Sequence, residues 1–239
     1  MPNFWQIEYS FVPLHLKKHY MMRKLLLTSL FILTVWTAVG QTSYCLSYDD
    51  FVQDRWVTVD TLSVVRRTNS AKIWSGGNDY RITASDKALD KVVAKQAFVV
   101  RQGDSLYVNC RHLQRQGVLF GKGYAKALRY DGDKLCMINI RCGRDEASSQ
   151  AGVAFMFGAV GAAVKANSML KNRVCYLIDS TSDGKRMEAT LMDEDFMGDV
   201  LLMDKELLEK YKSVEKEKNR ESAAIILPIL LKKGLIKAF

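Results

Sequence analysis

Two strand-like runs separated by three turn residues constrain the fold of this chain more than any other feature. The runs are Tyr124–Tyr130 and Lys134–Ile140, and residues 131–133 (Asp-Gly-Asp) join them. A short connection that contains Gly between two such runs is typical of a β-hairpin. Ala97–Arg101 and Leu106–Cys110 flank a second short turn of the same kind. The sequence therefore predicts at least two antiparallel hairpins in its first half.

Helix signals dominate the second half of the chain. Val174–Asp179 predicts a buried strand with which residues 185–191 could pair. Pro228 should kink or restart the last helix, because proline cannot donate the backbone hydrogen bond of a helix interior. The order of strands first and helices last favours an α+β fold. Helices are predicted over about 86–95, 193–203, 205–219 and 221–233.

Two further segments give local predictions. Residues 75–79 (Ser-Gly-Gly-Asn-Asp) form a strong turn signal between Ala71–Trp74 and Tyr80–Ile82, which reads as another hairpin. Residues 46–63 suggest a short helix or turn that leads into a strand. Residues 111–123 read as a connection around a short apolar run.

The stretch from Ala147 to Val164 carries no charge, and residues 151–164 are continuously apolar. Ala154, Gly158 and Ala162 are four residues apart, so a helix would place them on one stripe where another backbone could approach closely. Fourteen apolar residues are fewer than the roughly 20 that span a bilayer. A tightly packed helix in a soluble core is the preferred interpretation, and a membrane-inserted or interfacial helix and an ordered loop are the alternatives.

The first forty residues resemble a targeting segment. Basic residues at 23–24 precede the uncharged run Leu25–Trp36, and small residues follow it. That order is typical of a secretory signal peptide, with Ala38 and Gly40 at positions −3 and −1 of a cut before Gln41. The alternative is an uncleaved N-terminal anchor. Residues 1–20 make a long leader, so translation from Met21 or Met22 is a second possibility.

Removal of residues 1–40 leaves a chain that can bury one sizeable core. We expect a single α+β domain over 41–239, with a possible sub-boundary near 143–150. The whole chain has a formal charge of +9, and the removed part carries +3, so +6 remains. A mean hydropathy of −0.09 excludes a polytopic membrane protein. The composition is globular and excludes a disordered or collagen-like chain.

Basic residues concentrate between positions 101 and 144. Only three aspartates oppose them there, so this segment alone carries +6. Such a region could face an anionic lipid, an anionic polysaccharide or an acidic partner, although a solvated sheet face is the simpler interpretation. Nucleic acid is not expected for an exported protein. The nine basic residues are Arg101, Arg111, Arg115, Lys122, Lys126, Arg129, Lys134, Arg141 and Arg144.

The five cysteines all follow Gln41, and their number is odd, so disulfides in an oxidising compartment would leave at least one thiol. If Cys110 and Cys142 end neighbouring strands, they are the first candidates to pair. No Cys-x-x-Cys motif supports a thioredoxin-type or zinc site. Tyr44 directly before Cys45 is unlike a lipobox. The cysteines are Cys45, Cys110, Cys136, Cys142 and Cys175.

No catalytic, cofactor-binding or metal-binding residue can be assigned from the sequence. His112 is the sole histidine after Gln41, and Cys110-Arg-His112 is too small a motif to define a nucleophile or a metal site. The acidic residues 193–195 lack the spacing of an EF-hand and suit the first turn of a helix. Gly121-Lys122-Gly123 lacks the second half of a P-loop.

Residues 104–140, followed by AGVAFMFGAVGAA (151–163) and NRVCYLIDS (172–180), resemble an uncharacterised family of exported proteins of Bacteroidetes-type gut and oral bacteria. The resemblance covers most of the chain after Gln41 and ends in the DEDFMGDVLL and LLEKY helices. The family has no assigned activity, so the resemblance implies export and assigns no site.

Three functional hypotheses follow. The first is an exported envelope or periplasmic protein that acts as a non-enzymatic binding or structural module. The second is a hydrolase whose site is assembled from scattered carboxylates, because such pairs leave no spacing signature. The third is a membrane-associated protein that uses residues 151–164.

The leader makes one direct prediction. Mass spectrometry of protein recovered from fractionated cells should give Gln41 as the first residue, because small residues occupy both positions that a signal peptidase reads. Cytoplasmic protein with Met21 or Met22 intact at its start would contradict the export hypothesis.

Overall fold

The computed structural model describes residues 41–60, 62–75, 77–144, 173–179 and 186–237. The predictions for the leader and for the apolar segment 151–164 lie outside the described residues. Backbone contacts divide the chain after Gly40, and the unit that begins at Gln41 contains the described helices and strands.

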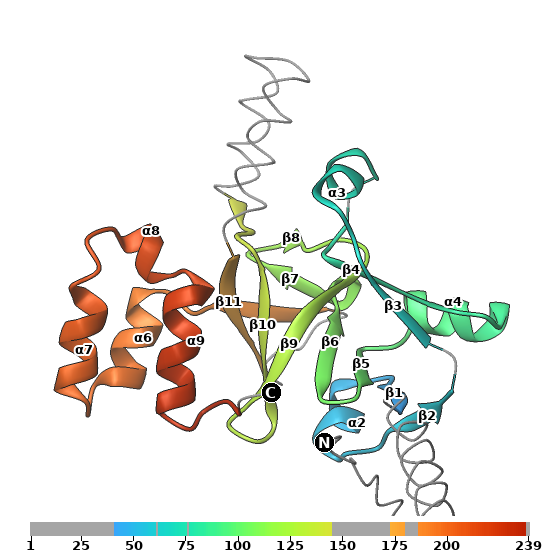
Figure 1. The fold of residues 1–239 in the computed structure, drawn as a ribbon, viewed down its shortest axis with the longest axis horizontal. Coiled ribbons are helices and arrows are strands. Elements are labelled where there is room, and N and C mark those ends of the chain that lie inside the picture. The colour runs from blue at the N-terminus through green and yellow to red at the C-terminus, as the bar shows by residue number, and fades with distance from the viewer. Residues whose placement is uncertain (1–40, 61, 76, 145–172, 180–185, 238–239) are drawn as a thin grey trace, which may run out of the picture. The chain divides into compact units, whose positions relative to one another are not determined.

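Both predicted hairpins are confirmed (Figure 1). Strands β9 (Tyr124–Tyr130) and β10 (Lys134–Ile140) pair antiparallel with Tyr130 opposite Lys134. Asp131 and Gly132 have φ values of 45° and 85°, which suit the left-handed backbone that such a tight turn requires. Strands β5 (Val99–Gln102) and β6 (Ser105–Asn109) turn at Gly103, whose φ is +54°.

The hairpins belong to one large mixed sheet with twelve strands among the described residues. Its main path runs β2-β1-β5-β6-β9-β10-β11-β12-β7-β8, and β3 and β4 form a branch that reaches β9 through Tyr80 and Tyr124. The remaining strands are β1 (Thr42–Cys45), β2 (Val57–Val59), β3 (Leu62–Arg66), β4 (Tyr80–Ala84), β7 (Leu113–Arg115), β8 (Val118–Leu119), β11 (Arg173–Ile178) and β12 (Met187–Leu191).

The sheet bends back toward its own beginning. Strand β7 follows β6 after a three-residue 3-10 helix (Cys110–His112), yet it pairs with β12, which lies at the far end of the path. This β7–β12 contact is the one parallel pairing among the described strands. A strongly curved sheet is required to bring these strands together, so one face becomes an inner face.

Alternation along the strands separates an inner core from two outer layers. Ala125 and Ala127 of β9 point to the inner core, as do Leu135 and Met137 of β10. Leu128 lies between the inner positions of β9 and points to an outer layer. Helix α2 (Tyr48–Val52), which Ser47 caps, places Phe51 in the inner core at 0% exposure.

The C-terminal helices cover one outer face of the sheet. They bury Met197, Leu201, Leu207 and Tyr211 against outward residues such as Leu128 and Cys136. These helices lie beside β10 and β11 in Figure 1, which confirms the predicted α+β fold. Helix α4 (Lys87–Lys95) and the β3–β4 branch cover a second outer layer. The C-terminal helices are α6 (Glu194–Leu201), α7 (Lys205–Lys212), α8 (Glu217–Arg220) and α9 (Ala223–Lys232).

Several local predictions are wrong for identifiable reasons. Residues 71–74 lie in helix α3 (Asn69–Ser75) rather than in a strand, because the Thr68 hydroxyl accepts from the Ala71 amide and caps a helix. The connection 111–123 contains a hairpin, β7–β8, whose turn places Gln116 and Gly117 at positive φ. Cys110, Arg111 and His112 form a 3-10 helix that Asn109 caps.

The helix boundaries also differ from the sequence prediction. The predicted helix 205–219 ends at Lys212, where the Ser213 hydroxyl donates to the Lys210 carbonyl at 2.7 Å, and resumes at Glu217. Helix α9 runs through Pro228 without restarting. The helix predicted over about 86–95 begins at Lys87, and Asp86 caps it by accepting from the Leu89 amide at 2.7 Å.

Two methionines test the inner core. Met137 is fully buried there, whereas Met203 is 92% exposed in the turn after α6. Met137→Ala should lower the free energy of unfolding by about 2–5 kcal/mol, because it leaves a cavity in close-packed surroundings. Met203→Ala should change it by less than about 0.5 kcal/mol. Guanidinium denaturation of both variants measures the difference, and equal losses would disprove the assigned core.

Candidate functional site

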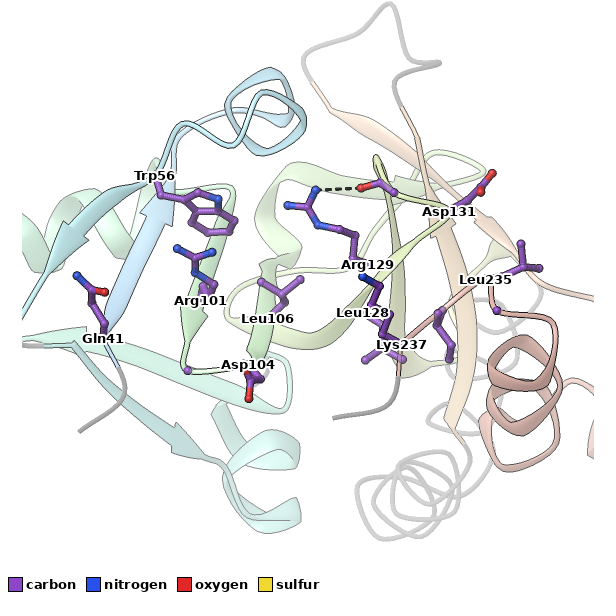
Figure 2. Close-up of a pocket in the computed structure, with 14 residues that line it drawn as sticks. Gln41, Trp56, Arg101, Asp104, Leu106, Leu128, Arg129, Asp131, Leu235 and Lys237 are labelled. Carbon is purple, nitrogen blue, oxygen red and sulfur yellow. Dashed lines mark hydrogen bonds between the residues drawn. The ribbon is translucent and has the colours of Figure 1, made fainter. Parts of the chain in front are cut away.

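An open cleft of about 690 Å³ lies where the inner face of the sheet meets the C-terminal segment (Figure 2). Its volume is within the usual range of small-molecule sites. Strands β5, β6 and β9 supply its floor, Trp56 forms one wall and residues 234–237 form another. The side chains that line the cleft include Trp56, Arg101, Leu106, Leu128, Arg129 and Lys237.

Arg101 is held in one orientation by two neighbours. Its guanidinium lies 4.4 Å from the centroid of the Trp56 ring, and its Nε donates to the Ser43 hydroxyl at 3.2 Å. Ser43 is the cross-strand partner of Arg101 and is 1% exposed. Among the described residues no carboxylate forms an ion pair with Arg101. Its two terminal nitrogens are therefore oriented and available to a ligand.

Arg129 is the second cation of the cleft. Its guanidinium lies 4.3 Å from the centroid of the Phe51 ring, and Nη1 donates to the Gly132 carbonyl at 2.9 Å. Its Nη2 is 3.4 Å from Asp54 Oδ1, a long contact between exposed groups. Asp54 also accepts from Trp56 Nε1 at 2.6 Å. Asp54 therefore links the two aromatic–arginine stacks and fixes the Trp56 ring.

The register explains why these two arginines meet. Arg101 is opposite Leu106, and Leu106 is opposite Ala127. Arg129 is two residues beyond Ala127 and so lies on the same inner face. Lys126 and Lys134 alternate to the outer face. The basic segment 101–144 is thus not one basic surface, and the part of it that lines the cleft is Arg101 and Arg129.

Trp56, Lys237 and Gln41 join the cleft from sequence positions remote from that segment. Residues 235 and 236 are held beside the β9–β10 turn, because the Asp131 amide donates to the Leu235 carbonyl at 2.9 Å and Ile236 bridges to Tyr130. No sequence motif indicated these residues, since the bent sheet alone brings them together.

Two further acidic side chains, Asp104 and Asp131, line the cleft. Figure 2 shows them at different sides, with their carboxylates pointing away from one another. A glycosidase-type mechanism needs two carboxylates that face one bond. These two carboxylates therefore do not face one bond across the cleft.

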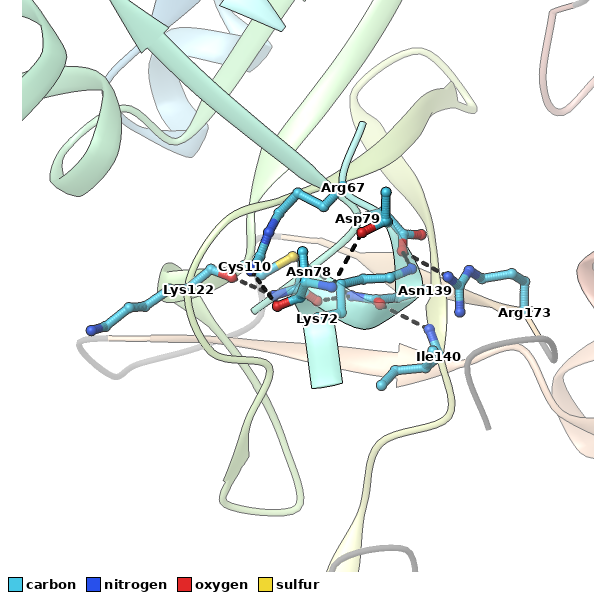
Figure 3. Close-up of polar contacts among 11 residues, drawn as sticks. Arg67, Lys72, Asn78, Asp79, Cys110, Lys122, Asn139, Ile140 and Arg173 are labelled. Carbon is cyan, nitrogen blue, oxygen red and sulfur yellow. Dashed lines mark hydrogen bonds and ion pairs between the residues drawn. The ribbon is translucent and has the colours of Figure 1, made fainter. Parts of the chain in front are cut away.

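A buried polar network lies between the loop before β4 and strands β10 and β11 (Figure 3). Asp79 Oδ1 accepts from Lys72 Nζ at 2.6 Å and from Arg173 Nη2 at 2.7 Å. Asn78 Nδ2 donates to the carbonyls of Phe120 and Lys122, and Asn139 Nδ2 donates to Asn78 Oδ1 at 2.9 Å. Arg173 Nη1 is buried without a hydrogen-bond partner among the described residues, but the contacts above join the loop before β4 to β10 and β11, so the network is structural.

The remaining sequence candidates have structural roles. The Lys122 carbonyl accepts from Asn78, and a Cβ at Gly123 would lie 3.0 Å from the Tyr80 carbonyl oxygen, so Gly123 permits a close backbone approach. Asp193 caps α6 by accepting from the Phe196 amide at 3.1 Å. Within the described part of the chain, no group of His, Cys, Asp and Glu is arranged to hold a metal ion.

Among the described residues the cysteines form no disulfide, so Cys110 and Cys142 are not paired as predicted. Cys110 is fully buried beyond the end of β6, where Asn139 Nδ2 lies 3.6 Å from its sulfur. Burial raises the pKa of the Cys110 thiol well above its ordinary value, and it raises the pKa of Cys45 to about 12. Both thiols therefore stay protonated and are poor nucleophiles.

His112 is a packed residue rather than a catalytic base. Its ring lies edge-on to Phe98 with centroids 6.4 Å apart, and Nε2 is buried without a hydrogen-bond partner. Burial, assisted by the charge of Arg111, lowers the pKa of His112 below its ordinary value.

In the described ranges, no helix is both long and apolar enough to cross a bilayer.

His112 gives a pH prediction. Its folded pKa is lowered, so its neutral form contributes stability that is complete above the unfolded pKa of about 6.5. This contribution is lost as the pH falls from about 6.5 toward the lower folded pKa, by at most about 1.4 kcal/mol per pH unit. His112→Gln should remove this slope of the free energy of unfolding against pH, measured between pH 7 and 5. An unchanged slope would show that other groups cause it.

Comparison with known families gives one match. A model of a family of unknown function, DUF6563, matches residues 43–237, which includes the cleft residues Trp56, Arg101 and Arg129. Searches among curated proteins and among solved structures found no match. Because the family model covers most of the chain, the chain belongs to the family of unknown function DUF6563.

Proposed function

We propose that this chain is an exported envelope or periplasmic protein whose single domain, residues 41–239, is a non-enzymatic module that binds an anionic ligand. The observation that carries the proposal is Arg101, whose guanidinium is fixed on Trp56 and by Ser43 with both terminal nitrogens open to the cleft. A planar guanidinium fork matches carboxylate and phosphate oxygens.

The surroundings of Arg101 support this function. Leu106, the cross-strand partner of Arg101, lies on the same inner face and is 8% exposed, so the floor beneath Arg101 is apolar. Charges above an apolar floor are less screened than charges in water, which strengthens their attraction for an anion. Arg129 and Lys237 add further positive charge to the same cleft.

The concave shape favours a small or oligomeric anion over a flat membrane surface. A cleft of about 690 Å³ can enclose a few sugar rings or a phosphorylated headgroup. The ligand chemistry is a carboxylate or a phosphate, and an acidic envelope glycan or a phosphoglycerol group could each supply it. The opposed directions of Asp104 and Asp131 support binding rather than hydrolysis.

Titration calorimetry with trigalacturonic acid and with glycerol phosphate tests the proposal and separates the two chemistries. Arg101→Gln should weaken binding about tenfold or more, because a charge-assisted hydrogen-bond pair is lost. Arg101→Lys should retain only part of the original affinity, because an ammonium lacks the planar fork. Arg66→Gln, a change of an exposed arginine on β3, is the matched control and should have no effect.

Failure of both probes to bind, or equal binding by the Arg101→Gln variant, would overturn the proposal. Sedimentation with phosphatidylglycerol vesicles supplies the membrane comparison. Binding to these vesicles without binding to either soluble probe would also overturn the cleft as the site.

A further inference from the structure

Gln41 lines the cleft although it is the first residue of the described unit. The next residue, Thr42, pairs with Gln102 on one side and with Val59 on the other. These pairings fix the start of β1 beside the β5–β6 turn, where Asp104 also lines the cleft. Figure 2 shows Gln41 at the end of the cleft that Arg101 and Asp104 occupy.

The predicted signal-peptide cut falls directly before this residue. Hydrolysis of the Gly40–Gln41 peptide bond consumes one water, leaves a carboxylate on Gly40 and gives Gln41 a free α-amino group. The backbone nitrogen of a residue that lines the cleft thereby changes from a neutral amide to an amine.

We propose that the α-ammonium group of Gln41, created by removal of the leader, is part of the anion-binding site, so that processing completes the site. This inference rests on the proposed function. It adds a donor at the start of β1, and it makes full affinity a property of the processed chain.

The charged side chains that line the cleft determine how the α-ammonium of Gln41 affects an anionic ligand. Arg101 on β5, Arg129 on β9 and Lys237 in the C-terminal segment face the same cleft, and Asp104 and Asp131 are the acidic groups among its lining residues. The start of β1 lies beside the β5–β6 turn that carries Asp104. An ammonium at the start of β1 adds positive charge to the part of the cleft that holds this carboxylate, and it offers its own N–H donors.

The new group also predicts a pH dependence. An α-amino group titrates at about 7.7–8.0, whereas lysine and arginine side chains titrate above about 10. Affinity for an anion should therefore fall between about pH 7 and 9 in the processed chain alone. A chain that retains residues before Gln41 has no group of this kind at the position.

The experiment compares four forms of residues 41–239, which form a compact unit separate from residues 1–40. The first carries a soluble tag before Gln41, and the second is the same protein cut so that Gln41 is the first residue. The third is the cut protein after cyclisation, in which the α-amino nitrogen attacks the side-chain carboxamide carbon and ammonia leaves. The fourth keeps one added Gly before Gln41, which retains the charge and displaces it.

The cut form should bind trigalacturonic acid about tenfold more tightly than the other three, and this advantage should disappear above about pH 9. Circular dichroism and thermal melting should be the same for all four. If all four forms bind with equal affinity and Arg101→Gln still abolishes that binding, the role of Gln41 is refuted and the proposed function is left intact. Tight binding by the Gly-extended form would show that total charge matters rather than position, and would refute the inference too. No binding by any form would refute the proposed function itself.

Discussion

The pairing of β9 with β10 is the interaction on which the rest of this structure depends. Strand β9 also pairs with β6, and β10 also pairs with β11, so the hairpin connects the two halves of the sheet. Its inward residues build the inner core, while Leu128 and Cys136 meet the C-terminal helices. A slip of one residue would exchange these two sets of side chains. The left-handed turn at Asp131 and Gly132 fixes the register and so protects both layers.

The cleft is a continuation of the same alternation. Val99 and Ala127 fill the inner core, and the next inward positions, two residues later on each strand, are Arg101 and Arg129. The apolar core thus ends in two arginines, each of which lies over an aromatic ring supplied by the chain around α2. Such stacking orients a guanidinium without neutralising it. The cleft is basic because the pattern of the strands places cations where the apolar inner residues end.

The sequence was sufficient for features that depend on nearby residues. Turn chemistry predicted both hairpins, and the late helices followed from their caps and apolar spacing. Features that depend on remote residues could not be predicted in this way. Nothing local in residues 111–123 indicates that Leu113 pairs with Met187, and nothing near Trp56 indicates that Arg101 lies against it. The prediction for residues 71–74 was wrong for a different reason, since Thr68 caps a helix where turn residues suggested a strand. The cleft therefore escaped prediction even though two of its cations belong to the basic segment.

The parallel contact between β7 and β12 has a consequence for how the chain acquires its structure. Met187 is more than seventy residues beyond its partner Leu113, whereas each hairpin closes within a few residues. Contacts of long sequence separation form slowly, because the chain must lose much freedom before it gains the contact. During synthesis, β7 must wait for residues near 190 before it can pair with β12, while the hairpins, β7–β8 among them, are already complete. The edge of β7 that faces away from β8 remains open throughout that interval, so the growing chain is most vulnerable to wrong pairing just before its helical part is made.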